Sequence, residues 1–168
     1  PAMATIVETR SGKLEGCEIE GVRVFRGVPY AQPPVGRLRF AAPELEAPWK
    51  GVRKALGFGP SAPQAPLALP MPGMDVGEQD EDCLYLNVYA PAAAAAPRPV
   101  MVWIHGGGFV IGSGSQAFYD GVRLARRGGV VLVNAIPAIK VDKKSDDVDF
   151  RSGKQIIARA LEEPLRQI

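Results

Sequence analysis

Two short runs of wholly apolar residues, with a glycine-rich loop and a helical stretch between them, constrain the fold of this chain most. The runs are Val100 to Ile104 and Val130 to Val133. Strands that are apolar at every position suit a parallel sheet, because both faces of such a sheet are covered. Between them, Asp120 can cap a short helix through Arg127, with Gly128 as its C-terminal stop. Strand, loop, helix and strand in this order predict an α/β fold.

The loop after the first apolar run reads His105-Gly106-Gly107-Gly108-Phe109. Three successive glycines let the main chain turn without side-chain obstruction, so neighbouring N–H groups can point at one oxygen atom. Such donors stabilise the oxyanion that develops during acyl transfer. The usual nucleophile, a serine in a Gly-x-Ser-x-Gly turn followed by an acid and a histidine, does not occur in this sequence. The loop is therefore predicted to be half of an ester-hydrolysing site.

Composition predicts one soluble globular domain and excludes several other classes. The 168 residues are 46% hydrophobic, and 20 basic and 18 acidic residues nearly balance, so nucleic acid is not an expected partner. The apolar runs are far shorter than the ~20 residues of a membrane-spanning helix, and no signal peptide is visible. Pro1-Ala2 before Met3 looks like the remnant of a cleaved expression tag, so the compartment is left unknown.

The first half of the chain is predicted to be strands and loop. Residues Thr5 to Gly27 alternate in short apolar and polar steps, which predicts two or three antiparallel strands in a small sheet. Recurrent prolines between Val28 and Gly77 exclude long helices and central strands, leaving a covering loop that is either ordered or disordered. Leu84, Leu86 and Val88 then alternate with polar or aromatic neighbours and predict a strand with one buried face.

The character of the sequence changes after Asn134. A polar loop from Lys140 to Asp149 precedes apolar residues at helical spacing, which predicts an amphipathic helical tail. Those residues are Phe150, Ile157, Leu161, Leu165 and Ile168. Pro164 lies inside the pattern and should divide the tail into two short helices or kink it. The predicted division of the chain is therefore 1–134 and 135–168.

Three stretches, in order, resemble the type-B carboxylesterases, the cholinesterase-like branch of the α/β-hydrolases. Phe25 to Gly36, with Arg39-Phe40, resembles the opening signature of that family. Glu81 to Asn87 resembles its second signature, and Trp103 to Phe109 resembles its oxyanion-hole segment. The resemblance covers roughly residues 4 to 134. It implies the N-terminal portion of an α/β-hydrolase, with a small antiparallel sheet, a covering loop and the first strands of the central sheet.

The resemblance also implies roles for the glycines. Gly107 and Gly108 would supply two N–H donors of the oxyanion hole, with Gly106 as possible support, while the third donor follows a catalytic serine that this chain lacks. Family members continue into a Tyr-Arg-Leu-Gly stretch, whereas this chain turns to Ala135-Ile136-Pro137. The expected function is thus the N-terminal portion of a carboxylic-ester hydrolase, inactive alone. No cofactor is expected, and a single histidine makes a metal centre improbable.

The tail has a different resemblance, to the equatorial domain of a group I chaperonin. It is carried by Ala135 to Ile139 and Ala158 to Ile168, without the segments that would bind nucleotide. This implies a chimera, and an alternative function as a non-enzymatic folded or assembly module. A third hypothesis is that a complementing fragment supplies the triad. A small ester would then be a substrate only after complementation, and self-association or the complementing fragment are the expected partners.

Other reactive side chains have simpler interpretations. His105 is the only histidine, but it sits at the strand end and is expected to pack rather than to act as a base. Ser113 and Ser115 lack the strand-to-helix context of an activated nucleophile and are expected in a flexible loop. The acidic run Asp80-Glu81-Asp82 is expected to be a structural strand entry rather than a metal or acid–base site.

The two cysteines, Cys17 and Cys83, make no disulfide framework and could pair only if the fold brought them together. Cys83 resembles a family cysteine that in animal members bridges to one upstream. The matching upstream stretch, Phe58 to Gln64, contains no cysteine. A free buried thiol is therefore expected at Cys83.

Overall fold

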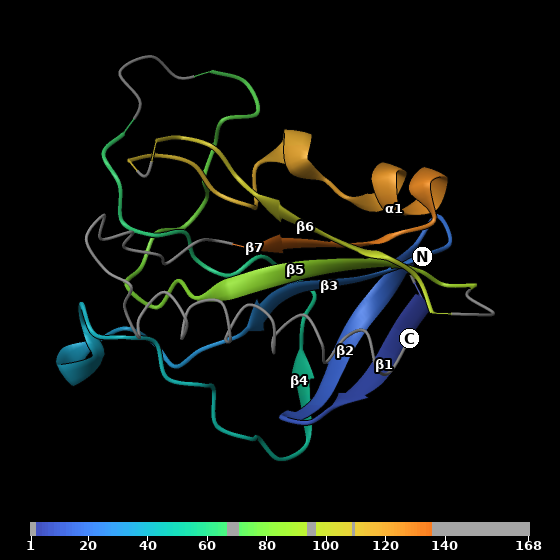
Figure 1. Ribbon diagram of the computed structural model, residues 1–168, viewed down its shortest axis with the longest axis horizontal. Helices are drawn as coiled ribbons and strands as arrows, with labels where there is room; N and C mark the ends of the chain where they lie inside the picture. Colours follow the sequence, from blue (N-terminus) through green and yellow to red (C-terminus); the bar gives the residue numbers. More distant parts are fainter. Residues whose placement is uncertain (1–2, 67–70, 94–96, 109, 136–168) are drawn as a thin grey trace.

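The computed structural model of the protein describes residues 3–66, 71–93, 97–108 and 110–135. Seven strands form a single sheet in the order β1-β2-β3-β5-β7-β6, with β4 paired to β2 beside this path (Figure 1). The strands are β1 (Met3–Thr9), β2 (Gly12–Ile19), β3 (Val22–Pro29), β4 (Val52–Lys54), β5 (Tyr85–Pro91), β6 (Val100–Ile104) and β7 (Val131–Ala135). The α-helix among the described residues is α1 (Val122–Gly128).

The first three strands form the antiparallel meander that the sequence predicts. They do not form a separate small sheet, however, because β3 also pairs antiparallel with β5, from Val22 opposite Pro91 to Pro29 opposite Tyr85. The register of this pair shifts between Phe25 and Val28. Such an irregularity bends and twists a strand, which lets one sheet continue from the meander into the later strands. The N-terminal strands and the central strands, which were expected to form two sheets, therefore form one sheet that bends between Phe25 and Val28 of β3.

The predicted parallel unit is present at the other end of the sheet. β6 and β7 pair in parallel, in register from Val100 opposite Val131, and α1 lies in the connection between them. The helix begins slightly later than predicted, although Asp120 still accepts a hydrogen bond from the backbone N–H of Val122 through Oδ1 at 3.0 Å. It includes Gly128, and the glycine that stops it is the C-cap Gly129, whose φ of 61° is left-handed.

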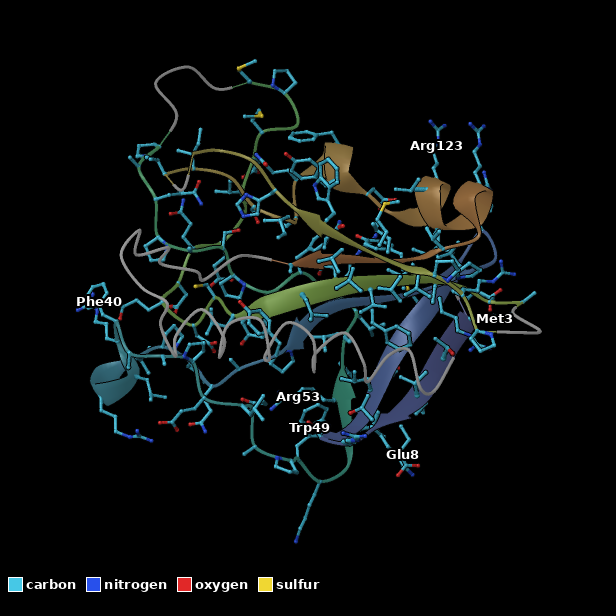
Figure 2. The ribbon with its side chains drawn as sticks, in the orientation of Figure 1. Met3, Glu8, Phe40, Trp49, Arg53 and Arg123 are labelled. Carbon is cyan, nitrogen blue, oxygen red and sulfur yellow. The ribbon has the colours of Figure 1, made fainter. Side chains whose placement is uncertain are left out.

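Only one face of α1 is buried. Val122 and Ala125 pack towards the sheet, where the helix contacts β3, β5 and β7. Arg123 points away from the sheet into solvent (Figure 2). This amphipathic arrangement covers one face of the central strands with a short helix.

Two predicted burial patterns are wrong, and the order of the strands explains both. β5 was expected to bury one face, but it lies between β3 and β7, and both Asn87 and Tyr89 on it are buried. β6 was expected to be covered on both faces, yet Trp103 remains 42% exposed and Ile104 51% exposed. β6 is the last strand in the order, so within the described residues it has a neighbour on one side only. Local apolarity did not reveal which strand is central.

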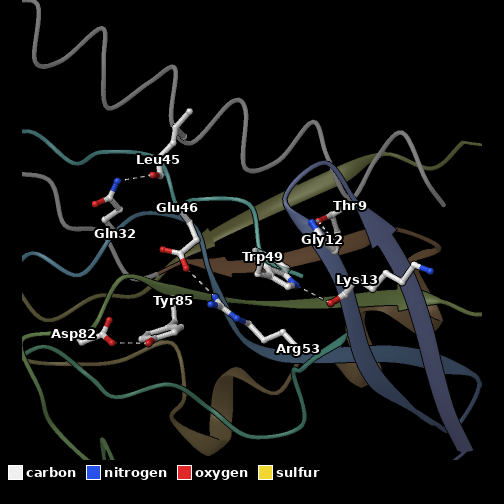
Figure 3. A network of polar contacts seen from close by, with 10 residues as sticks. All are labelled: Thr9, Gly12, Lys13, Gln32, Leu45, Glu46, Trp49, Arg53, Asp82 and Tyr85. Carbon is white, nitrogen blue, oxygen red and sulfur yellow. Dashed lines mark hydrogen bonds and ion pairs between the residues drawn. The ribbon is translucent and has the colours of Figure 1, made fainter. Parts of the chain in front are cut away.

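The proline-rich stretch is an ordered covering loop over much of its length. It contains β4, which pairs in parallel with β2 and which the prolines around it obscured in the sequence. Trp49 fastens this loop to the β1–β2 turn, because its Nε1 donates to the carbonyl of Lys13 at 3.0 Å (Figure 3). The Arg53 guanidinium lies 4.5 Å from the centre of the Trp49 ring, a cation–π contact, and also bonds Glu46.

The same ring explains a glycine in the turn. A Cβ at Gly12 would lie 2.5 Å from Trp49 Nε1, and the φ of Gly12 is +144°. Glycine is therefore the residue that lets the indole lie directly on the backbone of the turn. Thr9 closes the turn by donating its hydroxyl to the carbonyl of Gly12 at 2.7 Å.

The sheet separates two groups of buried apolar side chains. One consists of Leu14, Phe25, Ala55, Leu86, Val88, Ala90, Val131 and Val133. The other consists of Val22, Val24, Tyr89, Val122, Ala125 and Leu132. Because residues from β3, β5 and β7 alternate between the two groups, these three strands are the buried centre of the fold.

Several expectations concern features outside these strands. The predicted helical tail, 135–168, lies outside the described residues except for Ala135 at the end of β7. No helix among the described residues is long and apolar enough to cross a membrane. Cys17 and Cys83 are both free, and Cys83 is buried, as the sequence predicts for that thiol. Burial raises the pKa of the Cys83 thiol, and the neighbouring acidic residues raise it further.

Candidate functional site

The glycine loop begins directly after β6 and needs glycine at one position for steric reasons. A Cβ at Gly107 would lie 1.8 Å from the carbonyl oxygen of Ile111, and the φ of Gly107 is +122°. Gly108 has a φ of +62° but open space around it, and Gly106 also has open space. Gly107 is therefore the point of closest backbone approach, while Gly108 is glycine for its left-handed conformation.

Hydrogen bonds to two carbonyl groups fix the peptide planes of this loop. The carbonyl of Gly107 accepts bonds from the backbone N–H groups of Val110 at 3.1 Å and Ile111 at 3.2 Å. Nδ1 of His105 lies 2.8 Å from the carbonyl oxygen of Gly106. Since a carbonyl oxygen can only accept, Nδ1 carries the proton and donates it.

Each fixed carbonyl orients the N–H group on the same peptide plane. In a trans peptide the C=O and N–H bonds point in opposite directions, and no peptide bond among the described residues is cis. The carbonyl of Gly106 thus sets the direction of the Gly107 N–H, and the carbonyl of Gly107 sets that of the Gly108 N–H. Within the described part of the chain, neither N–H group makes a hydrogen bond. Two adjacent, oriented donors are left free.

The covering loop holds the far end of the glycine loop through Gln64. The N–H of Gly112 donates to Gln64 Oε1 at 2.7 Å, and Gln64 Nε2 donates to the carbonyl of Gly112 at 3.0 Å. Gly112 in turn lies against the start of the loop, since a Cβ there would be 2.5 Å from the carbonyl oxygen of Gly106. One side chain therefore joins two segments that are 48 residues apart in the sequence.

Ser113 is buried inside a small network of hydroxyl groups. Its Oγ lies 2.6 Å from Ser61 Oγ and 2.7 Å from Ser115 Oγ. Ser61 Oγ is also 2.6 Å from the carbonyl of Val76. Ser61 is the donor in both of its contacts, to Ser113 Oγ and to the carbonyl of Val76, so its one proton is shared between two acceptors. The expectation of a flexible loop is wrong for Ser113, which is fully buried and structural.

His105 packs against the loop instead of facing a nucleophile. The ring lies against the backbone of Gly112, where a Cβ would be 2.7 Å from Nδ1. Nε2 is buried and has no hydrogen-bond partner among the described residues. Within the described segments the ring packs on the backbone of the loop and bonds to no serine or carboxylate.

The acidic run before β5 makes structural contacts. Asp80 Oδ1 accepts the backbone N–H of Asp82 at 2.7 Å, and Asp82 Oδ2 accepts the hydroxyl of Tyr85 at 2.9 Å. Glu81 pairs with Arg39. Burial, followed by the bond to Asp82, raises the pKa of Tyr85 to about 12. No group of three or more metal-ligating side chains gathers in the segments that the structure describes.

The sequence indicates the glycine loop but not the side chains that hold it. The missed residues are Gln64, Ser61 and Gln116, whose Nε2 donates to the carbonyl of Met74 at 3.0 Å. Each bonds to a residue far away in the sequence, so no local pattern indicates the pairing. The one signal in the sequence is the glycine at position 112, which the close approach of its backbone to the carbonyl of Gly106 explains.

Comparison with known proteins identifies relatives over the described part of the chain. Residues 3–136 match the model of the family described as the carboxylesterase family. The chain is 46% identical over 128 residues to the para-nitrobenzyl esterase of Bacillus subtilis (strain 168). It is 49% identical over 132 residues to the phenmedipham hydrolase of Pseudarthrobacter oxydans. These matches cover 76% and 77% of this chain.

Solved structures show the same similarity. A thermophilic para-nitrobenzyl esterase superposes with a TM-score of 0.82 at 37% identity, covering 96% of this chain and 35% of that one. A para-nitrobenzyl esterase superposes with a TM-score of 0.75 at 45% identity, covering 80% of this chain and 28% of that one. The chain spans about a quarter of the length of the curated relatives, 26% and 27% for the two named above.

Proposed function

Because this chain belongs to the carboxylesterase family, we propose that its glycine loop is the oxyanion-binding part of a carboxylic-ester hydrolase site. The observation that carries the proposal is the pair of free, oriented N–H groups on Gly107 and Gly108. The N-terminal strands and β5 to β7 form the sheet that presents this loop at the end of β6.

The loop would act by stabilising charge. When a nucleophile adds to an ester carbonyl, the oxygen becomes an oxyanion, and fixed N–H donors stabilise that state more than the ground state. Gly107 and Gly108 supply the donors. Gly106 supports them, because its carbonyl accepts the bond from His105 and so holds the peptide that carries the Gly107 N–H. No metal or cofactor is needed for these steps.

The 168-residue chain by itself is not expected to turn over esters. Its sequence has no Gly-x-Ser-x-Gly turn. Ser113 is fully buried, with its hydroxyl in the network with Ser61 and Ser115. Nδ1 of His105 donates to a backbone carbonyl. Without an activated nucleophile, oriented oxyanion donors give only a modest advantage over water, and only for an ester that binds beside them.

The open side of β6 supports association with a complementing chain. The carbonyl of Pro99 accepts the N–H of Val131 from β7. In a parallel pair, alternate residues of a strand direct their N–H and C=O groups towards the neighbouring strand. The backbone groups of Val100, Val102 and Ile104 therefore point away from β7. Within the described residues no strand pairs with them. Unpaired backbone groups at a sheet edge accept a further strand, and exposed edges also promote self-association. The proposed substrate, a small ester, requires such a complement.

A rival proposal is a non-enzymatic chimera, in which a chaperonin-like tail covers the sheet and the chain acts as a folded or assembly module. It rests on the resemblance of Ala135 to Ile139 and of Ala158 to Ile168 to a chaperonin sequence. Light scattering on the purified chain separates the proposals. A stable monomer supports the self-contained chimera, whereas obligate association supports complementation.

A segment exchange tests the enzymatic proposal directly. Residues 3–135 would replace the corresponding segment of the Bacillus subtilis para-nitrobenzyl esterase, and hydrolysis of a para-nitrophenyl ester would be measured. We expect a folded, active hybrid that loses roughly a hundredfold or more in kcat with Gly107→Ala. The matched control is Gly57→Ala, which meets open space and has no positive φ. A folded but inactive hybrid contradicts the proposal.

A further inference from the structure

We propose that Gln64 is a positioning residue that sets the direction of the two oxyanion donors through Gly112. The catalytic role of the two N–H donors rests on the proposed function, whereas the effect of Gln64 on their direction does not. Gln64 lies in the covering loop and touches neither Gly107 nor Gly108 through any hydrogen bond that the structure contains. Its effect must therefore pass through the backbone that it binds.

The side-chain amide of Gln64 bonds to both the N–H and the carbonyl of Gly112. Oε1 accepts the N–H of Gly112, and Nε2 donates to its carbonyl, so the two groups form a cyclic pair of bonds. The second Nε2 hydrogen donates to the carbonyl of Ala62 at 3.1 Å. Both donors and the acceptor of the side chain are used, which fixes its rotamer.

The position of Gly112 decides where the first donor points. The backbone of Gly112, with a φ of +110°, lies so close to the carbonyl oxygen of Gly106 that a Cβ would approach to 2.5 Å. The carbonyl of Gly106 is thus held by its close approach to the backbone of Gly112 and by the bond from His105 Nδ1, whose ring also lies against Gly112. Because the peptide is planar, the N–H of Gly107 is held at the same time.

The second donor depends on the neighbour of Gly112 in the chain. Ile111 donates its N–H to the carbonyl of Gly107, whose peptide plane carries the N–H of Gly108. Ile111 also approaches Gly107 so closely that no Cβ fits between them. A displacement of Gly112 would move Ile111 and rotate this second peptide. One side chain therefore controls both planes.

The anchor of Gln64 is itself rigid. Its backbone N–H donates to Gln79 Oε1 at 2.8 Å, and Ser61, three residues earlier, is fully buried against Ser113. Gln64 is thus held by Gln79 and by the buried Ser61 on its N-terminal side. The covering loop is therefore a fixed support for the glycine loop, in addition to covering the sheet.

The test uses the full chain labelled with 15N, and compares Gln64→Met with the matched control Gln32→Met. Gln32 is another covering-loop glutamine, whose Nε2 donates to the carbonyl of Leu45 away from the glycine loop (Figure 3). For Gln64→Met we expect changed amide resonances at Gly107 and Gly108, and roughly tenfold faster hydrogen exchange at Val110 and Ile111 from the loss of two hydrogen bonds. Gln32→Met should leave all four unchanged.

Unchanged resonances and exchange at these four residues in a folded Gln64→Met chain would overturn the proposal. If that variant does not fold, Gln64→Asn withdraws the same amide by one methylene with a smaller change in volume, and the same criteria apply. In the segment-exchange hybrid, Gln64→Met should lower kcat while KM is retained, as expected for an interaction made in the transition state. An inactive parent hybrid would refute the proposed function, while the spectra of the chain still decide whether Gln64 positions the donors.

Discussion

Ser113 Oγ lies 2.6 Å from Ser61 Oγ, and both side chains are fully buried. This contact joins the covering loop to the turn that follows the glycine loop. The Ser113 hydroxyl also bonds to the hydroxyl and the backbone N–H of Ser115, so its contacts are those of a structural side chain. We therefore expect the loss of this contact to lower the free energy of unfolding.

Replacing Ser113 with alanine should destabilise the fold by about 1–3 kcal/mol, because the change removes the buried bonds that the Ser113 hydroxyl makes with Ser61 and Ser115 and leaves Ser61 with its bond to Val76 alone. The midpoint of urea denaturation measures the effect. The control is Ser11→Ala, since the Ser11 hydroxyl makes no hydrogen bond within the described residues, and it should change stability by less than about 0.5 kcal/mol. Equal effects of the two variants would argue against a structural network.

The glycines of the loop should differ sharply in their tolerance of a methyl group. Gly106→Ala meets open space at an ordinary φ, so we expect less than about 0.5 kcal/mol. Gly108→Ala also meets open space, but its φ of +62° should cost about 1–2 kcal/mol. Gly107→Ala should be the most disruptive, because its Cβ would overlap the carbonyl of Ile111. Thermal unfolding of the three variants gives this order, and any other order contradicts the loop geometry.

The contact between Gly12 and Trp49 should appear as a coupling energy. Gly12→Ala alone forces the indole away and strains a φ of +144°, while Trp49→Ala alone removes the ring and its bond to Lys13. In the double variant the ring is gone, so the added methyl group no longer collides. We expect the two changes to be non-additive by about 1 kcal/mol or more in a denaturation cycle. Additive effects would mean that the ring does not lie on the turn.

Tyr85 should titrate late and make the fold sensitive to alkali. Its pKa is raised to about 12 by burial and by its bond to Asp82. Because the neutral phenol is favoured in the folded state, its contribution to stability is complete below the ordinary pKa of about 10, and is lost as the pH rises from there to about 12. Tyrosinate absorbance at high pH, as a difference between the chain and Tyr85→Phe, measures the value.

The same titration separates the two causes. Asp82→Asn removes the carboxylate but keeps the burial, so it should bring the pKa of Tyr85 only part of the way back to its ordinary value. A complete return would show that Asp82, and not burial, is the larger cause. Titration of Tyr85 near its ordinary value in the unaltered chain would contradict the observed environment.

The sequence allowed the local elements to be predicted, because their signals are local. Alternation located β1 to β3, the apolar runs located β6 and β7, and the spacing of Asp120 and the glycines located α1 to within about two residues. β4 was missed because three residues beside prolines carry no periodic pattern. Its identity as a strand depends on β2, which lies far away in the chain.

The arrangement of the elements could not be predicted in the same way. The exposure of Trp103 depends on the position of β6 at the end of the strand order, and the burial of Tyr89 on the central position of β5. For the site, three glycines were enough to locate the loop. The bonds from Gln64 to Gly112 join residues 48 apart, and only the tertiary structure brings them together. The oxyanion roles of Gly107 and Gly108 stay a prediction.

We propose that the chain carries the oxyanion half of a carboxylesterase site without an activated nucleophile. The most direct measurement is the intact mass of the purified, folded chain before and after incubation with a fluorophosphonate, which reacts with activated serines. We expect no adduct on this chain, and one adduct on the hybrid with the remaining segments of the para-nitrobenzyl esterase. A stoichiometric adduct on the chain alone, mapped to Ser113, Ser115 or any other serine, would show that a serine is activated and would contradict the proposed half-site.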